Sequence, residues 1–435
     1  MERRTFVRRY LKFISQYKKL EEEKKKCLKQ YFDNQTVIQV HSANIIRSMN
    51  SVLNVDMLGH FKFSEELIIN RPVQRQIWKI NRRGSFWEVE VPMFTEEEFK
   101  QQFRMSRRSF EKLCTELSFL TREDTNKRKA IPLDKRIAIA LSTLGRCHSY
   151  KTVSNLFGVG RTTVGELVTQ FTTAVCEVMQ DQYINAYPPT PEKIEEILGG
   201  FQQLGLPQCY GVLGVNHIEI SPNRSDSADY LNSEGWHSVI LLAAVDHSGK
   251  FTFTHVGSKG KTPSNDIFES STLKAIHKSD ELFAEHNKLL DGSKVPIFLV
   301  GSSAFGLTEH VMKPYPENDE LSENARILND VLFECQKIAA AAFKYLKSRF
   351  AMIGLGLEVH ENNCNTIIKA CCVLHNFLVE ENDYVWDSWL TDLDEQVNRK
   401  ANIQPEEIVE FNADAKEGIE IRESLTKIIN EHCSS

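Results

Sequence analysis

Polar side chains gather at the end of one apolar stretch, "YGVLGVNHIEI", residues 210–220. The stretch begins like a buried strand and turns polar at Asn216, His217 and Glu219. Ligands and substrates of α/β folds commonly bind where buried strands end. Imidazole and carboxylate groups are the usual carriers of acid–base chemistry. The pattern is typical of a buried strand that carries an active site at its end, and this strand could carry either the chemistry or only the outline of such a site.

A second pattern, "SYKTVSNLFGVGRTTVGELVTQF" over residues 149–171, could contact DNA. It predicts a short helix, a tight turn at Gly158 and Gly160, and a second amphipathic helix, which is the signature of a helix-turn-helix. In such units the first residues of the second helix reach the bases. The expected DNA contacts are Lys151, Arg161, Thr162 and Thr163. Glu166 would repel phosphate and weaken binding, and an ordinary αα-hairpin is the alternative interpretation.

Two groups of Cys and His residues have the types for metal binding or nucleophilic catalysis. Five fall in one stretch: His360, Cys364, Cys371, Cys372 and His375. Their spacing is not a known zinc pattern, so core packing of a helix is the favoured interpretation. Cys147 and His148 are adjacent, but no orienting acid is apparent in the sequence, which favours a buried pair at a helix end.

The composition fits a globular chain that can bury two or three cores, since 41% of its 435 residues are hydrophobic and 26% are charged. No run of about 18 apolar residues predicts a membrane-spanning helix, and the N-terminus lacks the apolar region of a secretory signal. The ten Cys are expected to be reduced thiols of the nucleus or cytosol.

The net charge of −6 is unevenly distributed. Residues 1–30 hold eleven Lys or Arg against four Glu, whereas residues 379–435 hold fifteen Asp or Glu against five Lys or Arg. A basic head and an acidic tail are compatible with nucleic-acid contact at one end. Two solvated helical faces are the alternative.

The elements that must position these residues can be read from periodicity. A capping box formed by Thr95 and Glu98 starts a helix, and further helices follow Ser106 and cover 133–145. After a Pro-rich link, strands are predicted at 210–220, 236–245, 250–256 and 295–301, and helices at 264–277, 323–350 and 364–380. Three hairpin-linked strands followed by helix, strand and helices predict an α/β layer architecture compatible with a ribonuclease H-like core.

Several phrases of this region resemble the PIF/Harbinger transposases, which are DDE endonucleases. The stretch from "HIEISPNRSDSADYLNSEGWHSV" to "TPSNDIFESSTL" resembles the family's catalytic core, and "FKYLKSRF" and "ACCVLHNF" resemble its closing motifs. The helix-turn-helix also sits where the family carries one. The resemblance covers roughly residues 95–380. It implies a ribonuclease H-like DDE core preceded by an α-helical helix-turn-helix domain.

The resemblance also locates the four acidic ligands of two divalent metals, which such enzymes use for in-line displacement at phosphorus. The family positions fall here on Gly214 in "GVLGVNH", Asp266 in "PSND", Ser302 in "FLVGSSAF" and Ala340 in "IAAAAFKYLK". Asp266 alone is acidic and could offer at most weak metal binding. Mg²⁺ needs several hard oxygen ligands to replace its water, so strand cutting by the family mechanism is expected to be lost.

Two cations follow the last of these positions. Lys347 and Arg349 would face the DNA backbone in an active family member, and they could still bind phosphate without a metal. Charges on a solvent-exposed helix face are the alternative interpretation.

These observations lead to one expected function with two alternatives. The expected function is that of a domesticated, nuclease-inactive Harbinger-derived factor that associates with DNA or chromatin. The resemblance implies a Myb/SANT-like partner and location in the nucleus, with or without a cytoplasmic pool. The alternatives are an active endonuclease using Mg²⁺ or Mn²⁺, and a protein-interaction scaffold; outside the endonuclease alternative no cofactor is expected. The sequence does not predict an oligomeric state.

The expected organisation has four parts. Residues 1–94 form a charged N-terminal helix and an irregular extension, 95–185 the helical helix-turn-helix domain, 205–380 the transposase-derived domain, and 381–435 an acidic C-terminal tail.

Overall fold

The computed structural model describes residue 26 and residues 84–433, apart from 125–128, 185–188, 224–225, 279–285, 291, 317–320, 360, 401 and 406–413. The expectations for residues 1–83, including the basic N-terminal helix, lie outside the described residues. The chain divides into two compact units, Met1–Gly84 with Thr115–Leu133, and Ser85–Cys114 with Asp134–Ser435. In the first unit the structure describes a 3-10 turn, η4 (Ser118–Leu120). All packing described below lies within the second unit.

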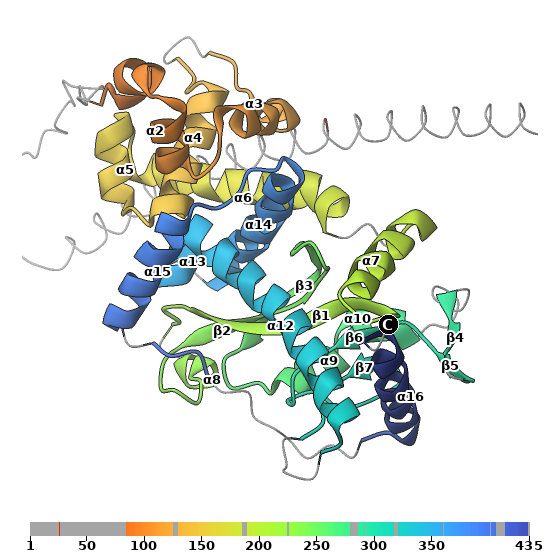
Figure 1. The fold of residues 1–435 in the computed structure, drawn as a ribbon. Coiled ribbons are helices and arrows are strands. Elements are labelled where there is room, and N and C mark those ends of the chain that lie inside the picture. The colour runs from red at the N-terminus through yellow and green to blue at the C-terminus, as the bar shows by residue number, and fades with distance from the viewer. Residues whose placement is uncertain are drawn as a thin grey trace, which may run out of the picture. The chain divides into compact units, whose positions relative to one another are not determined.

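A five-stranded mixed sheet forms the centre of this unit, with the strand order β3-β2-β1-β6-β7 (Figure 1). β1 pairs antiparallel with β2 and β2 antiparallel with β3, while β6 runs parallel to β1 and β7 parallel to β6. A separate hairpin joins two further strands. The strands are β1 (Cys209–Glu219), β2 (Ser238–Val245), β3 (Phe251–Lys259), β4 (Lys288–Leu290), β5 (Ser293–Val295), β6 (Phe298–Val300) and β7 (Val311–Met312).

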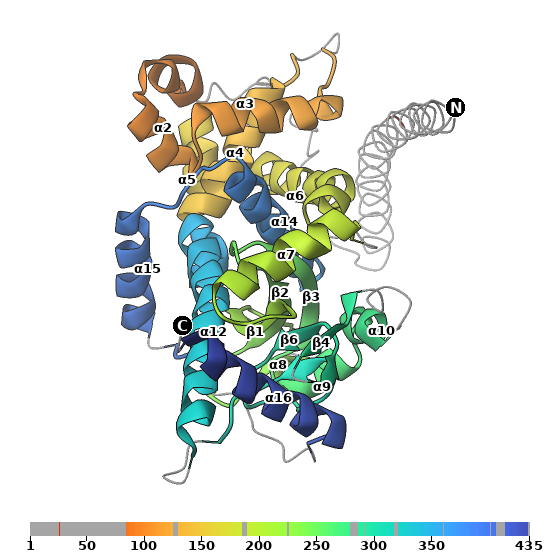
Figure 2. The ribbon, with the colours of Figure 1, turned by 45° about the vertical axis from the view of Figure 1, so that its right-hand side comes forward.

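Every residue of β2 is buried, because helices pack against both faces of the sheet. The long helix α12 (Glu323–Arg349) crosses β1, β2 and β6, and α7 (Pro191–Gln203) packs against β1 (Figures 1 and 2). α14 (Glu361–Glu380) packs against β3 on one side and α6 (Arg161–Tyr183) on another. The remaining helices of the sheet region are α8 (Ser227–Tyr230), α9 (Ser264–Glu269), α10 (Thr272–Lys278) and α13 (Ala351–Leu355).

The helical region before the sheet begins with the predicted capping box. Thr95 Oγ1 accepts a hydrogen bond from the Glu98 backbone N–H while the Glu98 carboxylate accepts one from the Thr95 N–H, which starts α2 (Glu96–Phe103). The elements that precede and follow it are η2 (Phe86–Glu90), η3 (Val91–Met93), α3 (Arg107–Glu116), α4 (Leu133–Arg146) and α5 (Tyr150–Phe157). Rings from separate elements form an aromatic core: Phe86, Trp87, Phe99, Phe103, Phe110 and Phe157.

The predicted strands and helices are present in the predicted order, and three of the expected segments differ in form. The helix expected at 264–277 is two helices, because the hydroxyls of Ser270 and Ser271 bond to carbonyls of the preceding turn and end α9. The strand expected at 295–301 is shorter, since Pro296 separates β5 from β6. The acidic tail contains two helices, α15 (Asp387–Lys400) and α16 (Lys416–Cys433), which both pack against α12. Among the described helices, none combines the length and apolar character needed to cross a membrane.

Candidate functional site

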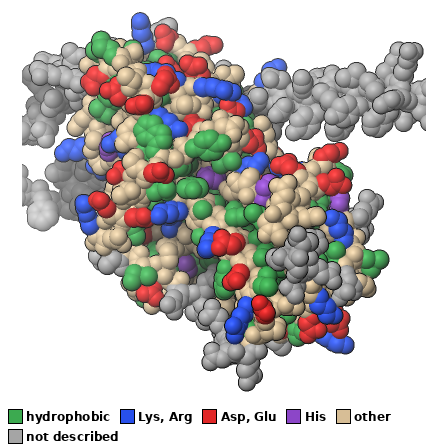
Figure 3. All heavy atoms as spheres, in the orientation of Figure 1, with side chains coloured by type: hydrophobic (Ala, Val, Ile, Leu, Met, Phe, Trp, Pro, Cys, Tyr) green, Lys and Arg blue, Asp and Glu red, His purple; other side chains and the backbone are tan. Residues whose placement is uncertain are grey.

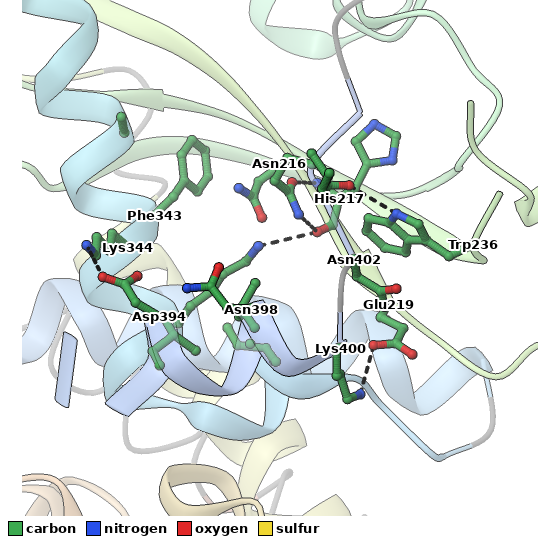
Figure 4. A pocket seen from close by; sticks show the side chains of 18 of the residues that line it. Asn216, His217, Glu219, Trp236, Phe343, Lys344, Asp394, Asn398, Lys400 and Asn402 are labelled. Atoms are coloured by element: carbon green, nitrogen blue, oxygen red, sulfur yellow. Dashed lines mark hydrogen bonds and ion pairs between the residues drawn. The ribbon is translucent and has the colours of Figure 1, made fainter. Parts of the chain in front are cut away.

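A pocket of about 860 Å³ lies beside the polar end of β1. Its walls are the second half of β1, one face of α12, and a segment that we call the cover, which consists of α15 and residues 402–404 (Figure 4). Asn216, His217 and Glu219 all line it. The polar strand end that the sequence pointed to thus borders a pocket, and whether it carries chemistry stays a prediction.

Gly214 lies on the face of β1 that is turned toward α12. A Cβ atom added at Gly214 would come within 2.4 Å of the Phe343 ring and 3.5 Å of the Ala339 side chain. Contacts under about 3 Å are not tolerated between carbon atoms in packed interiors. The Phe343 ring thus occupies the space that an acidic side chain at position 214 would need.

The other family positions fall into two groups. Ser302 follows β6, which runs parallel to β1 with Val300 opposite Val212, so Ser302 lies near the level of Gly214. Beside it, the Gly301 carbonyl accepts a hydrogen bond of 2.9 Å from the α12 side chain Gln336. Asp266 is exposed in the first turn of α9 and does not line the pocket, whereas its neighbour Asn265 is buried and accepts from the Gly306 N–H.

These positions do not fit the two divalent metals that the resemblance implies. Ala340 lines the pocket, but it and Gly214 have no oxygen ligand in their side chains, and Ser302 offers a neutral hydroxyl. Phe343 fills the space between β1 and α12 where the ligands would meet. Among the residues that the structure describes, no three His, Cys, Asp or Glu side chains are grouped as a metal site.

The cover is fastened to β1 by polar contacts (Figure 4). The Gln404 amide accepts from the His217 N–H at 3.0 Å and donates to the His217 carbonyl at 3.1 Å. The Lys400 ammonium pairs with Glu219 at 2.9 Å, and the Trp236 indole N–H donates to the Ile403 carbonyl at 3.1 Å. These contacts join residues that lie far apart in the chain, so sequence reasoning missed the whole cover.

The His217 imidazole is neutral at physiological pH. Burial and the nearby Lys347 ammonium lower its pKa to about 4. Its Nδ1 atom lies 2.9 Å from the Ser238 hydroxyl. Since no carboxylate contacts this ring in the described residues, His217 lacks the orienting acid of a catalytic triad.

Lys347 reaches the pocket from α12, where its ammonium lies 3.4 Å from the His217 carbonyl. Burial lowers the pKa of Lys347 to about 8. Arg349 is instead buried at 2% exposure, where it donates to the Arg104 carbonyl and pairs with Asp383 at 3.5 Å. The expectation that Arg349 contacts phosphate on a surface is therefore wrong, because this guanidinium is enclosed between α12, α2 and the segment after α14.

The predicted helix–turn–helix segment consists of α5, a turn at Gly158 and α6. Gly158 adopts the left-handed conformation at φ 65°, and α6 begins at Arg161. Lys151, Arg161 and Thr162 are exposed and Thr163 is half-buried. On the face drawn in Figure 3, the acidic and basic side chains of the described residues are interspersed. DNA contact by this segment stays a prediction.

The Cys and His side chains of α14 are core residues. Cys364, Cys371, Cys372 and His375 are all buried, and His375 Nε2 lies 3.0 Å from the Gly249 carbonyl. Burial lowers the pKa of His375 to about 4. His360 lies outside the described residues.

Cys147 and His148 are half-buried directly after α4. Burial raises the pKa of Cys147 and lowers that of His148, so both groups are held neutral rather than activated.

Comparisons with known proteins identify two regions of the chain. Residues 215–376 match the DDE superfamily endonuclease family, and residues 81–177 match a domain of unknown function. The protein "antagonist of like heterochromatin protein 1" of Arabidopsis thaliana is 27% identical over 319 residues, which cover 69% of this chain and 78% of that protein. The "putative nuclease HARBI1" of Homo sapiens is 23% identical over 271 residues, covering 61% of this chain and 73% of that protein. No solved structure matches.

Proposed function

The chain belongs to the Harbinger-derived family of DDE-superfamily proteins, and from this premise we propose that it is a domesticated transposase that no longer cuts DNA. It acts in the nucleus as a DNA- or chromatin-associated factor together with a Myb/SANT-like partner. The mixed sheet, with three antiparallel strands followed by two parallel ones, supports a ribonuclease H-like core.

The observation that carries the loss of cutting is the packing of Phe343 against Gly214. A pair of divalent metals is held by carboxylates that converge from separate elements. Here the ring excludes an acid from the first strand, and Asp266 is the one acidic side chain of the four family positions. One exposed carboxylate cannot offset the dehydration of two Mg²⁺ ions.

Association with DNA is supported by the exposed start of α6. Arg161 and Thr162 present a cation and a hydroxyl at the first turn, and Lys151 is exposed on α5. These are groups that bind phosphates and base edges. The name of the Arabidopsis relative refers to heterochromatin protein, which favours a chromatin role.

Cutting is tested by incubating the purified chain with supercoiled plasmid and Mg²⁺ or Mn²⁺, with an unrelated metal-dependent nuclease as positive control. We expect the plasmid to stay supercoiled. The animal relatives carry the name of putative nuclease, so the alternative is an active enzyme. Nicking that disappears in Asp266→Ala would establish that alternative and end the proposal.

DNA association is tested with Arg161→Glu and with Lys337→Glu as the matched charge reversal, since Lys337 is an exposed cation of α12 outside the pocket. We expect Arg161→Glu to weaken duplex binding and to reduce the slope of log K against log salt by about one. Lys337→Glu leaves both unchanged. A protein-interaction scaffold without DNA binding would instead keep its location and its partners in Arg161→Glu. That result would favour the scaffold over the DNA-associated factor.

A further inference from the structure

The charges that line the pocket do not balance. Its described lining holds five charged side chains: Lys344, Lys347 and Lys400 as cations, and Glu219 and Asp394 as anions. Glu219 is paired with Lys400 at 2.9 Å, and Asp394 is paired with Lys344 at 2.8 Å. Since His217 is neutral, one positive charge is left over, and it belongs to Lys347.

Lys347 is the least compensated of these groups. Its one hydrogen bond to the described residues is the 3.4 Å contact with the His217 carbonyl, and no described carboxylate pairs with it. A half-buried ammonium without a counter-ion is costly, because desolvation disfavours the charged form. An anion in the pocket would remove this cost.

A second unsatisfied group faces the same space. The Asn216 side chain lines the pocket, and its buried Oδ1 atom has no hydrogen-bond partner among the described residues. Buried polar atoms are nearly always paired, so this oxygen calls for a donor such as a hydroxyl group. Asn398 and Asn402 of the cover add two further amide groups to the lining of the pocket (Figure 4).

We propose that this pocket binds a small hydroxyl-bearing phosphate ester, with its phosphoryl group on the Lys347 ammonium and a hydroxyl on Asn216. Of the four family positions, Ala340 alone lines this pocket, and it offers Lys347 no carboxylate. The inference does not rest on DNA binding by α6.

The cover favours a small molecule over duplex DNA, because it narrows the space in front of Lys347. α15 and residues 402–404 form one wall of the pocket, and they are held against β1 and Trp236 by the Gln404, Lys400 and Trp236 contacts described above. A sugar phosphate fits within a volume of about 860 Å³.

Calorimetric titration of the full chain tests the proposal with five probes: ribose 5-phosphate, AMP, inorganic phosphate, adenosine and a 20-base-pair duplex. We expect ribose 5-phosphate and AMP to bind, inorganic phosphate to bind more weakly, and adenosine not to bind. Lys347→Met should weaken binding of both esters about tenfold or more, since a charge-assisted contact is lost. Lys337→Met, the same change on the same helix outside the pocket, should stay within about twofold.

Loss of binding in Lys347→Met should not result from unfolding, because this substitution removes a buried charge. The circular dichroism spectrum of the variant checks that it is folded. Absence of ester binding at millimolar concentration would overturn the proposal, as would equal binding by Lys347→Met. Competition between the duplex and AMP that depends on Lys347 would also overturn it, since the phosphate would then come from DNA. Failure of the duplex to bind at all would count against the proposed function and not against this site.

Discussion

The contact between Gly214 and Phe343 determines what residue 214 can be. An added Cβ atom would meet the ring at 2.4 Å. We expect Gly214→Ala to destabilise the fold by about 1–3 kcal/mol, the usual cost of overpacking. In a Phe343→Leu background the same change should cost about 1 kcal/mol less or be neutral, because the smaller side chain makes room. Urea unfolding of the four chains measures this coupling.

Gly199 provides the matched control, since an added Cβ there meets no atom within 4 Å. Gly199→Ala should stabilise α7 by up to about 1 kcal/mol, because alanine favours a helix. Additive effects of Gly214→Ala and Phe343→Leu would show that the ring does not occupy the space of an acid at position 214.

Lys347 predicts a pH dependence of stability whose sign follows from its lowered pKa. The folded-state pKa is about 8, and that of an unfolded lysine is about 10.4. Between these values the unfolded chain holds one proton more, so stability rises with pH and a penalty present at pH 7 is relieved. The other titratable or charged groups around the ammonium are His217, Glu219, Lys344, Asp394 and Lys400.

Lys347→Met should therefore be more stable than the wild type at pH 7, and the difference should shrink between pH 8 and 10.5. Urea unfolding of both chains over pH 7–10.5 measures this difference, while Lys337→Met should show no such trend. A difference that stays constant with pH would mean that Lys347 has an ordinary pKa.

Sequence patterns located the polar end of β1 but could not describe its surroundings. Alternation along a strand places Asn216 on the face of Gly214, yet which α12 residue meets that face depends on the rotation of the helix, so Phe343 could not be identified. Arg349 looked like a surface cation because its partner, Asp383, lies 34 residues further along the chain. Gln404 and Lys400 are separated from β1 by a still longer stretch of the chain, and nothing in their local sequence predicts that they line a pocket.

At the scale of elements, Asp383 joins the helical region to α12. Its carboxylate accepts from the Ser106 N–H at 2.7 Å and the Ser109 hydroxyl at 2.9 Å, and it pairs with Lys100 at 2.7 Å and with Arg349. Asp383→Asn should destabilise the fold by about 3–5 kcal/mol, because it leaves buried cations uncompensated. Asp394→Asn, which removes an exposed partner of Lys344, should cost less than about 1 kcal/mol in the same urea unfolding experiment.

The acid limit of stability should depend on this carboxylate. Burial alone would raise the pKa of Asp383, but Arg349, Lys100 and the Ser106 N–H together hold it below its usual value. Because the folded-state pKa is lowered, the contribution of the Asp383 carboxylate to the free energy of unfolding is complete above about pH 4. This contribution is lost as the pH falls through the folded-state pKa. Wild-type stability should therefore fall more steeply than that of Asp383→Asn below pH 4; parallel curves would contradict this assignment.

Elements with strong local signals were predicted well, and elements that depend on distant partners were not. The capping box at Thr95 and the turn at Gly158 are local, so α2 and the α5–α6 pair could be placed from sequence. α15 reads as an acidic, polar segment because few of its side chains are apolar; its packing rests on Trp389 and Leu393 alone among buried residues. Local sequence therefore does not predict that this helix packs against α12.

At the scale of the molecule, α14 determines how the helical region and the sheet unfold. Residues 370–378 of this helix are buried without interruption, and a helix that is apolar on all sides must be enclosed. α6 encloses it on one side and β3 on another. Separating the two regions would expose this helix, so they should unfold together although the sequence suggested separate domains.

Asn376 of α14 provides the means to test this cooperativity. Its side-chain amide donates to the Tyr183 carbonyl at the end of α6 and to the Phe251 carbonyl of β3, both at 2.7 Å, and accepts from the Phe251 N–H at 2.8 Å. Asn376→Ala should cost about 3 kcal/mol or more, since three buried backbone groups lose a partner.

Thermal unfolding followed by fluorine-labelled Trp87 in the helical region and Trp236 beside the sheet should give one midpoint, lowered equally at both sites. Asn398→Ala on the exposed face of α15 should shift neither midpoint. Two separate midpoints, with one region resistant to Asn376→Ala, would mean that α14 does not join the helical region to the sheet and that α5 and α6 fold independently of the pocket.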